Sequence, residues 1–124
     1  MRFLIASIAA LTASLALGCG AAAPVPSEQI TQTQAAIRAA EEVGAPSVPK
    51  AALHLKMARD QLQTAQGLIS QDENEEAGLV LDRARVDAEL ALALAKEASL
   101  RAQAAEALEK VRKLRAEAGN LKTK

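Results

Sequence analysis

One long uninterrupted seam of alanine and leucine constrains the fold of this chain most. The segment from Asp72 to Ala118 contains no proline, and small or apolar residues recur in it mostly at alternating steps of four and three. Such spacing places residues on one face of an α-helix, in the manner of a coiled coil. The sequence therefore predicts a helix of about 70 Å, ended by Gly119-Asn120. Its seam consists of Ala77, Leu81, Ala84, Ala88, Ala91, Ala95, Ala98, Ala102, Ala105, Leu108 and Val111.

The composition points to an all-α fold. Alanine supplies about a quarter of the 124 residues, and Glu, Gln, Lys, Arg and Leu supply most of the rest. These residues are the best helix formers, and their predominance is typical of long helices. No stretch alternates apolar and polar residues with period two, so we expect no strands. The chain has a formal net charge of zero and one aromatic residue, Phe3, which argues against nucleic acid as a partner.

Two shorter helices are expected before the long one. The first runs from Glu28 to Val43 with Ser27 as its N-cap, and Gly44 ends it. Pro46 and Pro49 interrupt the helical pattern, because both cannot lie inside one regular helix. Ser47 is the expected N-cap of a second helix over residues 50–69, with Pro49 in its first turn. A polar turn at residues 70–74 leads into the long helix. The first apolar stripe is Ile30, Ile37, Ala40 and Val43; the second is Ala51, Leu55, Ala58, Leu62, Ala65 and Ile69.

Two arrangements of these helices remain open. The first is a long antiparallel hairpin folded at about residue 71, whose first arm is broken at Pro46–Pro49. It pairs Leu62 with Leu81 and Leu55 with Ala88, and it pairs Ile37 with Ala105 and Leu108, and Ile30 with Val111 and Leu114. The alternative is a compact three-helix bundle, in which the first helix turns back. It is favoured by residues that widen the apolar face beyond one partner's reach, namely Leu90, Leu92 and Leu94.

The N-terminus has the pattern of a secretory signal. Arg2 is followed by an apolar run that ends at Gly18-Cys19, and this run is too short for a comfortable membrane span. A cysteine at the cleavage point resembles a bacterial lipobox, although Ala16 stands where leucine is usual. The resemblance implies a signal peptide over residues 1–18, a palmitate-type lipid on Cys19, and sorting to the outer membrane facing the periplasm. A flexible tether (19–26), a helical domain (27–119) and a short basic tail (120–124) follow.

The segment from Gly44 to about Ala105 resembles a family of alanine-rich helical domains of unknown function in bacterial lipoproteins. The resemblance rests on Gly44-Ala45-Pro46 through Pro49, on the Leu/Ala helix after it, and on residues 87–91 (Asp-Ala-Glu-Leu-Ala). Relatives often continue into a C-terminal OmpA-like peptidoglycan-binding domain, which this sequence does not contain. The family supplies no catalytic residues, and the resemblance implies a structural role in the envelope.

Three groups of side chains are candidate sites. His54 is the only histidine and lies off the seam, so we expect a solvated surface residue and no metal ligand. Acidic residues in the turn lack the spacing of a calcium loop and suit a helix N-terminus; these are Asp72, Glu73, Glu75 and Glu76. A basic cluster suits the C-terminus of the long helix, where cations complement the helix dipole; alternatively, in the hairpin it would lie beside Ser27 and face anionic lipid headgroups. It consists of Lys110, Arg112, Lys113, Arg115, Lys122 and Lys124.

These features favour a non-enzymatic, lipid-anchored periplasmic scaffold or interaction protein. The only cysteine is the predicted lipid site, so no free thiol remains for disulfides, metal binding or nucleophilic catalysis, and no cofactor is expected. The lipid attaches the chain to the membrane, and its other partners would be an envelope protein or a second copy. One alternative is a Braun-type lipoprotein linked to peptidoglycan through Lys124, although Leu121-Lys122-Thr123 does not match that family's ending. Another is an adaptor that regulates an envelope enzyme through the acidic tip.

Overall fold

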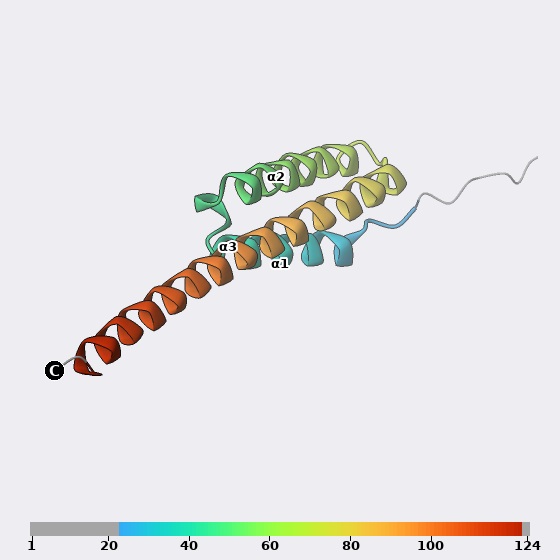
Figure 1. Cartoon of the computed structure of the whole chain (residues 1–124). Helices are drawn as coiled ribbons and strands as arrows, with labels where there is room; N and C mark the ends of the chain where they lie inside the picture. The colour runs from blue at the N-terminus through green and yellow to red at the C-terminus, as the bar shows by residue number, and fades with distance from the viewer. Residues whose placement is uncertain (1–22, 123–124) are drawn as a thin grey trace, which may run out of the picture.

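The computed structural model describes residues 23–122, which form three α-helices and one short 3-10 helix (Figure 1). Helix α1 covers Ser27–Glu42, η1 covers Ala45–Ser47, α2 covers Pro49–Ile69 and α3 covers Asn74–Lys122. No strand occurs within this described range. The predicted all-α fold is therefore confirmed. The predicted signal peptide (1–18), the lipid site Cys19 and the first part of the tether lie outside the described residues.

Local backbone geometry explains both reversals of the chain. Gly44 has φ 90°, a left-handed conformation that glycine adopts without the steric cost of a Cβ atom. Pro49 occupies the first turn of α2, where its missing N–H has no helical partner to lose. Between α2 and α3, Asp72 takes a positive φ of 63°, which Asp tolerates better than most residues. Both breaks lie where the sequence predicts them.

Some predicted helix ends are wrong. Pro26 and Val48 occupy the N-cap positions of α1 and α2, where Ser27 and Ser47 were expected, and neither helix start has a side-chain cap. Gly119 does not end α3, which continues to Lys122, so the basic tail begins inside the helix. A glycine inside a helix costs only about 1 kcal/mol relative to alanine, so Gly119 is accommodated within α3.

Helices α2 and α3 form the antiparallel pair that the heptad spacing predicts. Ala51, Leu55 and Ala58 of α2 are buried in one cluster with Ala88, Ala91 and Ala95 of α3. Nearer the turn, Ala65 is buried with Ala77 and Leu81, and Leu62 packs against the same group. Alanine at successive seam positions allows the helix axes to approach closely. The pairings of Leu55 with Ala88 and of Leu62 with Leu81 are thus confirmed.

Helix α1 differs from the hairpin prediction. It runs beside the first half of α3 and antiparallel to α2, as Figure 1 shows. Ile37 is buried in the cluster that contains Ala88 and Ala91, whereas Ala105, its predicted partner, is exposed. The pairing of α1 with the C-terminal half of α3 is therefore wrong. The reversal at Gly44 folds α1 back, so that the arrangement is the three-helix alternative.

The side chains that complete this packing only partly match the prediction. Thr33 is buried between α1 and α3, whereas Val43, which the predicted stripe contained, is 40% exposed. Leu92 and Leu94 pack against the core, as the three-helix alternative requires, but Leu90 stays exposed. Helix α3 thus presents a buried inner seam on one side, namely Ala77, Leu81, Ala84, Ala88, Ala91 and Ala95.

The second half of α3 extends beyond the other two helices (Figure 1). Its 49 residues give α3 a length of about 73 Å, while the 21 residues of α2 span only about 32 Å. Every residue from Ser99 to Asn120 is exposed. We call residues 99–120 the projecting half of α3.

Candidate interaction surface

A second apolar stripe runs along the outer side of α3, away from α1 and α2. Its large members are between 40% and 64% exposed. Single exposed leucines are common on protein surfaces, but a row of them on one helix is informative. They recur mostly at steps of three, four or seven, so they lie on one face. We call this face the outer stripe; it comprises Leu79, Val86, Leu90, Ala93, Leu100, Ala104, Ala107, Val111, Leu114 and Ala118.

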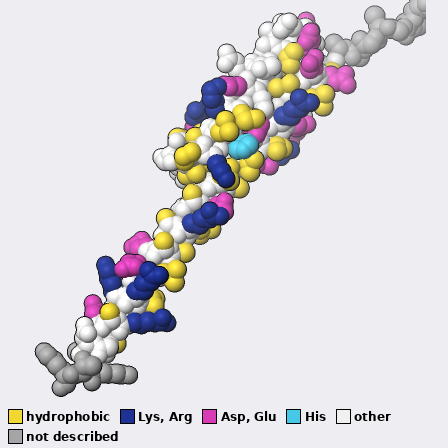
Figure 2. Space-filling view, turned by 45° about the horizontal axis from the view of Figure 1, so that its top comes forward, with side chains coloured by type: hydrophobic (Ala, Val, Ile, Leu, Met, Phe, Trp, Pro, Cys, Tyr) yellow, Lys and Arg dark blue, Asp and Glu magenta, His cyan; other side chains and the backbone are white. Residues whose placement is uncertain are grey.

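The outer stripe and the inner seam lie on nearly opposite sides of α3. Ala102 continues the inner seam and Ala104 belongs to the outer stripe, and two residues along a helix turn the side chain by roughly 200°. Both alanines are exposed. Figure 2 shows apolar side chains lying between charged ones along this part of the molecule. The outer stripe was not predicted as a separate face, because Val111 was assigned to the predicted seam and Leu114 to the hairpin contact with Ile30.

Two charged residues interrupt the outer stripe, and one of them is paired within its own helix. Arg83 and Glu97 occupy positions that would continue the spacing. The Glu97 carboxylate forms an ion pair of 2.5 Å with the Arg101 guanidinium. This i,i+4 pair lies on the surface, with 51% of the Glu97 side chain and 79% of the Arg101 side chain exposed. Between Glu97 and Asn120 the stripe has no further charged member.

The basic cluster does not lie beside the start of α1, contrary to the hairpin prediction. The backbone carbonyl of Ala23, just before α1, accepts a hydrogen bond of 2.7 Å from Asn74 Nδ2 at the start of α3. Arg112 lies about 57 Å along the helix from Asn74. Lys110, Lys113 and Arg115 are exposed on the same projecting half. The side chain of Lys122 and all of Lys124 lie outside the described part.

His54 is not the isolated surface residue that its position off the seam suggested. Its Nδ1 lies 2.9 Å from Asp87 Oδ1, and Gln61 Nε2 donates to Asp87 Oδ2 at the same distance. The Asp87 side chain is 16% exposed and that of His54 is 27% exposed. One carboxylate on α3 thus joins two residues two turns apart on α2. The sequence contains a signal for this contact: His54 directly precedes Leu55, Asp87 directly precedes Ala88, and Leu55 and Ala88 are a predicted pair.

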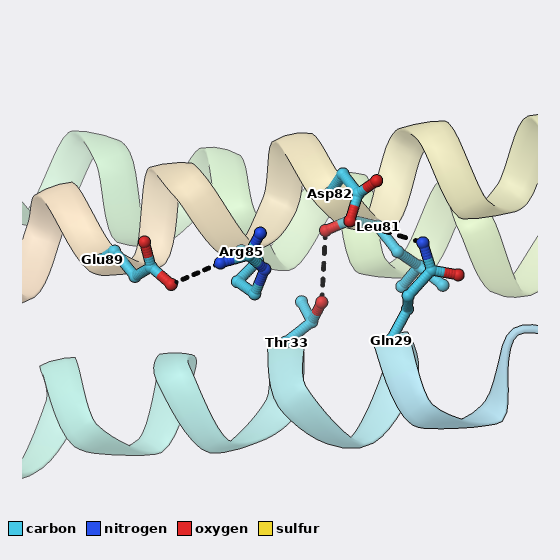
Figure 3. A network of polar contacts seen from close by, with 6 residues as sticks. All are labelled: Gln29, Thr33, Leu81, Asp82, Arg85 and Glu89. Atoms are coloured by element: carbon cyan, nitrogen blue, oxygen red, sulfur yellow. Dashed lines mark hydrogen bonds and ion pairs between the residues drawn. The ribbon is translucent and has the colours of Figure 1, made fainter.

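A second polar network joins α1 to α3 (Figure 3). Thr33 Oγ1 donates to the backbone carbonyl of Leu81 at 3.2 Å, and Gln29 Nε2 donates to Asp82 at 3.4 Å. Gly78 lies beneath the Gln29 side chain, where a Cβ atom would come within 3.3 Å of it. The neighbouring Arg85 and Glu89 form an ion pair of 2.8 Å. The bonds from Thr33 and Gln29 set the position of α1 along α3.

The acidic turn shows no arrangement of a metal centre. Among residues 23–122, no three His, Cys, Asp or Glu side chains are placed to hold a metal ion. Asp72, Glu73, Glu75 and Glu76 border an open depression near Ala23 at the N-terminus of α3, where negative charge complements the helix dipole. Within the same described range, no helix is long and apolar enough to cross a membrane.

Comparison with known proteins places the helical region in one family. The model of a domain of unknown function (DUF4398) matches residues 28–119, which cover α1, α2 and nearly all of α3. No match was found among curated proteins or among solved structures.

Proposed function

This chain belongs to the DUF4398 family, and from this premise we propose that it is a non-enzymatic, lipid-anchored helical interaction protein of the bacterial envelope. One observation supports the proposal most strongly: α3 carries an apolar stripe that neither α1 nor α2 covers. Exposed leucines at helical spacing on a projecting helix are typical of a protein interaction surface. In this proposal the bundle is the base, and the projecting half of α3 is the binding element.

The position of the predicted anchor supports an orientation in which the projecting half of α3 points away from the membrane. Cys19 is four residues before Ala23, and four residues span at most about 14 Å. Ala23 contacts Asn74 at the start of α3, so a lipid on Cys19 would hold this end of the molecule near the membrane. Helix α3 would then carry the outer stripe up to about 70 Å from the anchor. Gly20 after the cysteine favours sorting to the outer membrane, with the bundle in the periplasm.

The proposal of a non-enzymatic role rests on the residues that carry chemistry. The only cysteine is the predicted lipid site, and the only histidine is held against Asp87. Histidine is the side chain that most often serves in general acid–base catalysis. The contact between His54 on α2 and Asp87 on α3 gives His54 a structural role instead.

Photo-crosslinking in intact cells tests the interaction role. A photoreactive amino acid at position 104 lies on the outer stripe, and the same amino acid at position 102 is a matched control on the opposite side. We expect discrete crosslinked products from position 104 and few from position 102. Equal products from both positions, or none from either, would contradict the proposal.

The anchor has a separate test. Fatty-acid labelling should be present in the unmodified protein and absent from Cys19→Ser, because the lipid would attach to that sulfur. Labelling that persists in this variant would remove the lipoprotein part of the proposal. Release from purified peptidoglycan only after wall digestion, abolished by Lys124→Arg, would instead support the Braun-type alternative.

A further inference from the structure

We propose that the outer stripe binds a second copy of this chain in an antiparallel pair over residues 93–118. The inference rests on the proposed interaction role of α3 and names the partner, but it does not require the lipid anchor. A two-fold axis near residues 105–106 would relate the two helices. The overlap would span about 39 Å, and the same surface of each copy would contribute to it.

The apolar layers support this register. In it, Leu100 lies opposite the partner's Val111, and Ala104 lies opposite the partner's Ala107. Symmetry repeats both layers on the other side of the axis. Ala93 lies opposite the partner's Ala118 at each end. Small residues at the centre and larger ones outside them form a seam of the coiled-coil type.

Charges beside the stripe also match in this register. Lys96 flanks the stripe at one end, and in the antiparallel pair it faces the partner's Glu117. Symmetry produces this opposite-charge pair twice. Lys110 faces the partner's Gln103, and Arg101 faces the partner's Leu108, against which its aliphatic carbons can pack. No like charges meet across this register.

The parallel arrangement meets repulsion at the same positions. In a parallel pair, residues flanking the seam contact partner residues five positions further along. Lys96 would then face the partner's Arg101, and Lys110 would face the partner's Arg115. Each contact would occur twice, and like charges across an interface oppose association. Charge complementarity therefore selects the antiparallel pair.

The bundle leaves room for the second helix. Helices α1 and α2 cover the inner seam of α3 and pack against Leu92 and Leu94 beside it, whereas Leu90 and Ala93 on the outer stripe are exposed. The partner's projecting half can therefore run past the base without displacing α1 or α2. Glu97 faces the partner's Leu114 in this register, and its ion pair with Arg101 offsets its charge there.

Disulfide trapping between two single-cysteine variants tests the register. Both are made in the full-length chain with Cys19→Ser, purified in mild detergent, so that the introduced thiol is the only one. Ala104→Cys carrying one tag is mixed with Ala107→Cys carrying a tag of different size. Under mild oxidation, we expect the mixed 104–107 disulfide to exceed both self-disulfides. Ala102→Cys mixed with Ala105→Cys is the control, and it should form little product.

The mass of the protein in solution provides the second measurement. Val111→Lys should convert the dimer to a monomer without loss of helical circular dichroism, because Val111 is exposed in the single chain. Ala102→Lys should leave the dimer intact. Predominant self-disulfides at 104 and 107 would indicate a parallel pair and overturn the proposal. A monomer whose position 104 still crosslinks to another envelope protein in cells would also overturn it, while leaving the proposed function standing.

Discussion

Thr33 on α1 donates a hydrogen bond from Oγ1 to the backbone carbonyl of Leu81 on α3, at 3.2 Å and fully buried. The acceptor keeps its place in the helical ladder, so the hydroxyl adds a contact without breaking one. Packing of α1 removes the Thr33 hydroxyl from water, and burying a hydroxyl without a hydrogen bond is costly. The bond to Leu81 avoids that cost. It therefore fixes α1 beside the first half of α3 instead of the second.

Replacing Thr33 by leucine should destabilise the bundle by about 1–3 kcal/mol, because the site is closed and a larger side chain must displace its neighbours. Thr31→Leu is the matched control. Thr31 is exposed and bonds only within α1, so this change should stay within about 0.5 kcal/mol. Thermal unfolding followed by circular dichroism measures both. Equal effects of the two variants would show that Thr33 is not a packing residue.

Asp87→Ala should cost about 1–3 kcal/mol, since it leaves the donors of His54 and Gln61 without their acceptor. Asp82→Ala is the control on the same helix, because Asp82 is exposed and its contact with Gln29 is long, at 3.4 Å. Chemical denaturation of the two variants provides the comparison. A negligible effect of Asp87→Ala would mean that the network is not maintained in solution.

Two glycines should respond to alanine with opposite signs. Gly44 has φ 90°, so Gly44→Ala should destabilise the chain by about 1 kcal/mol through strain in the left-handed region. Gly67 lies inside α2, and a Cβ atom there would meet nothing within 4 Å. Gly67→Ala should therefore stabilise the fold by up to about 1 kcal/mol. Melting temperatures that move in the same direction would contradict the assigned turn.

Glu97→Leu should strengthen self-association, because it completes the outer stripe opposite the partner's Leu114. Burying a leucine contributes about 1.5–3 kcal/mol, so each symmetric site corresponds to roughly a tenfold or larger gain in affinity. Glu106→Leu adds the same side chain on the other side of the helix and should not change the dimer in this way. Sedimentation equilibrium compares the variants. An unchanged dissociation constant for Glu97→Leu would argue against the register.

The sequence predicts the α2–α3 pair well, because the spacing of Leu55, Leu62 and Leu81 is a local property of each helix. It cannot decide the position of α1, because the seam of α3 repeats every heptad. Ile37 finds an apolar partner at Ala88 and equally at Ala105. The choice depends on the backbone conformation of Gly44 and on the buried hydroxyl of Thr33, and neither follows from apolar periodicity.

The interaction surface was only partly predictable for a related reason. Leu100, Val111 and Leu114 are visible in the sequence, but a single apolar register already accounted for the fold of α3. The second register can be interpreted as an interaction surface only when the structure shows that α1 and α2 leave the outer stripe exposed. The basic cluster was misplaced relative to Ser27 because its position depended on the hairpin.

A distance between spin labels tests the central arrangement most directly, namely that α1 lies beside the first half of α3 and leaves the second half projecting. Labels at the exposed positions Arg38 and Glu89 should give a short distance, under about 20 Å. Labels at Arg38 and Glu109 should lie about 30 Å or more apart, by the helix rise. Dilution with unlabelled protein removes contributions from a second copy. A short distance between positions 38 and 109, with a long one between 38 and 89, would restore the long hairpin and contradict this account.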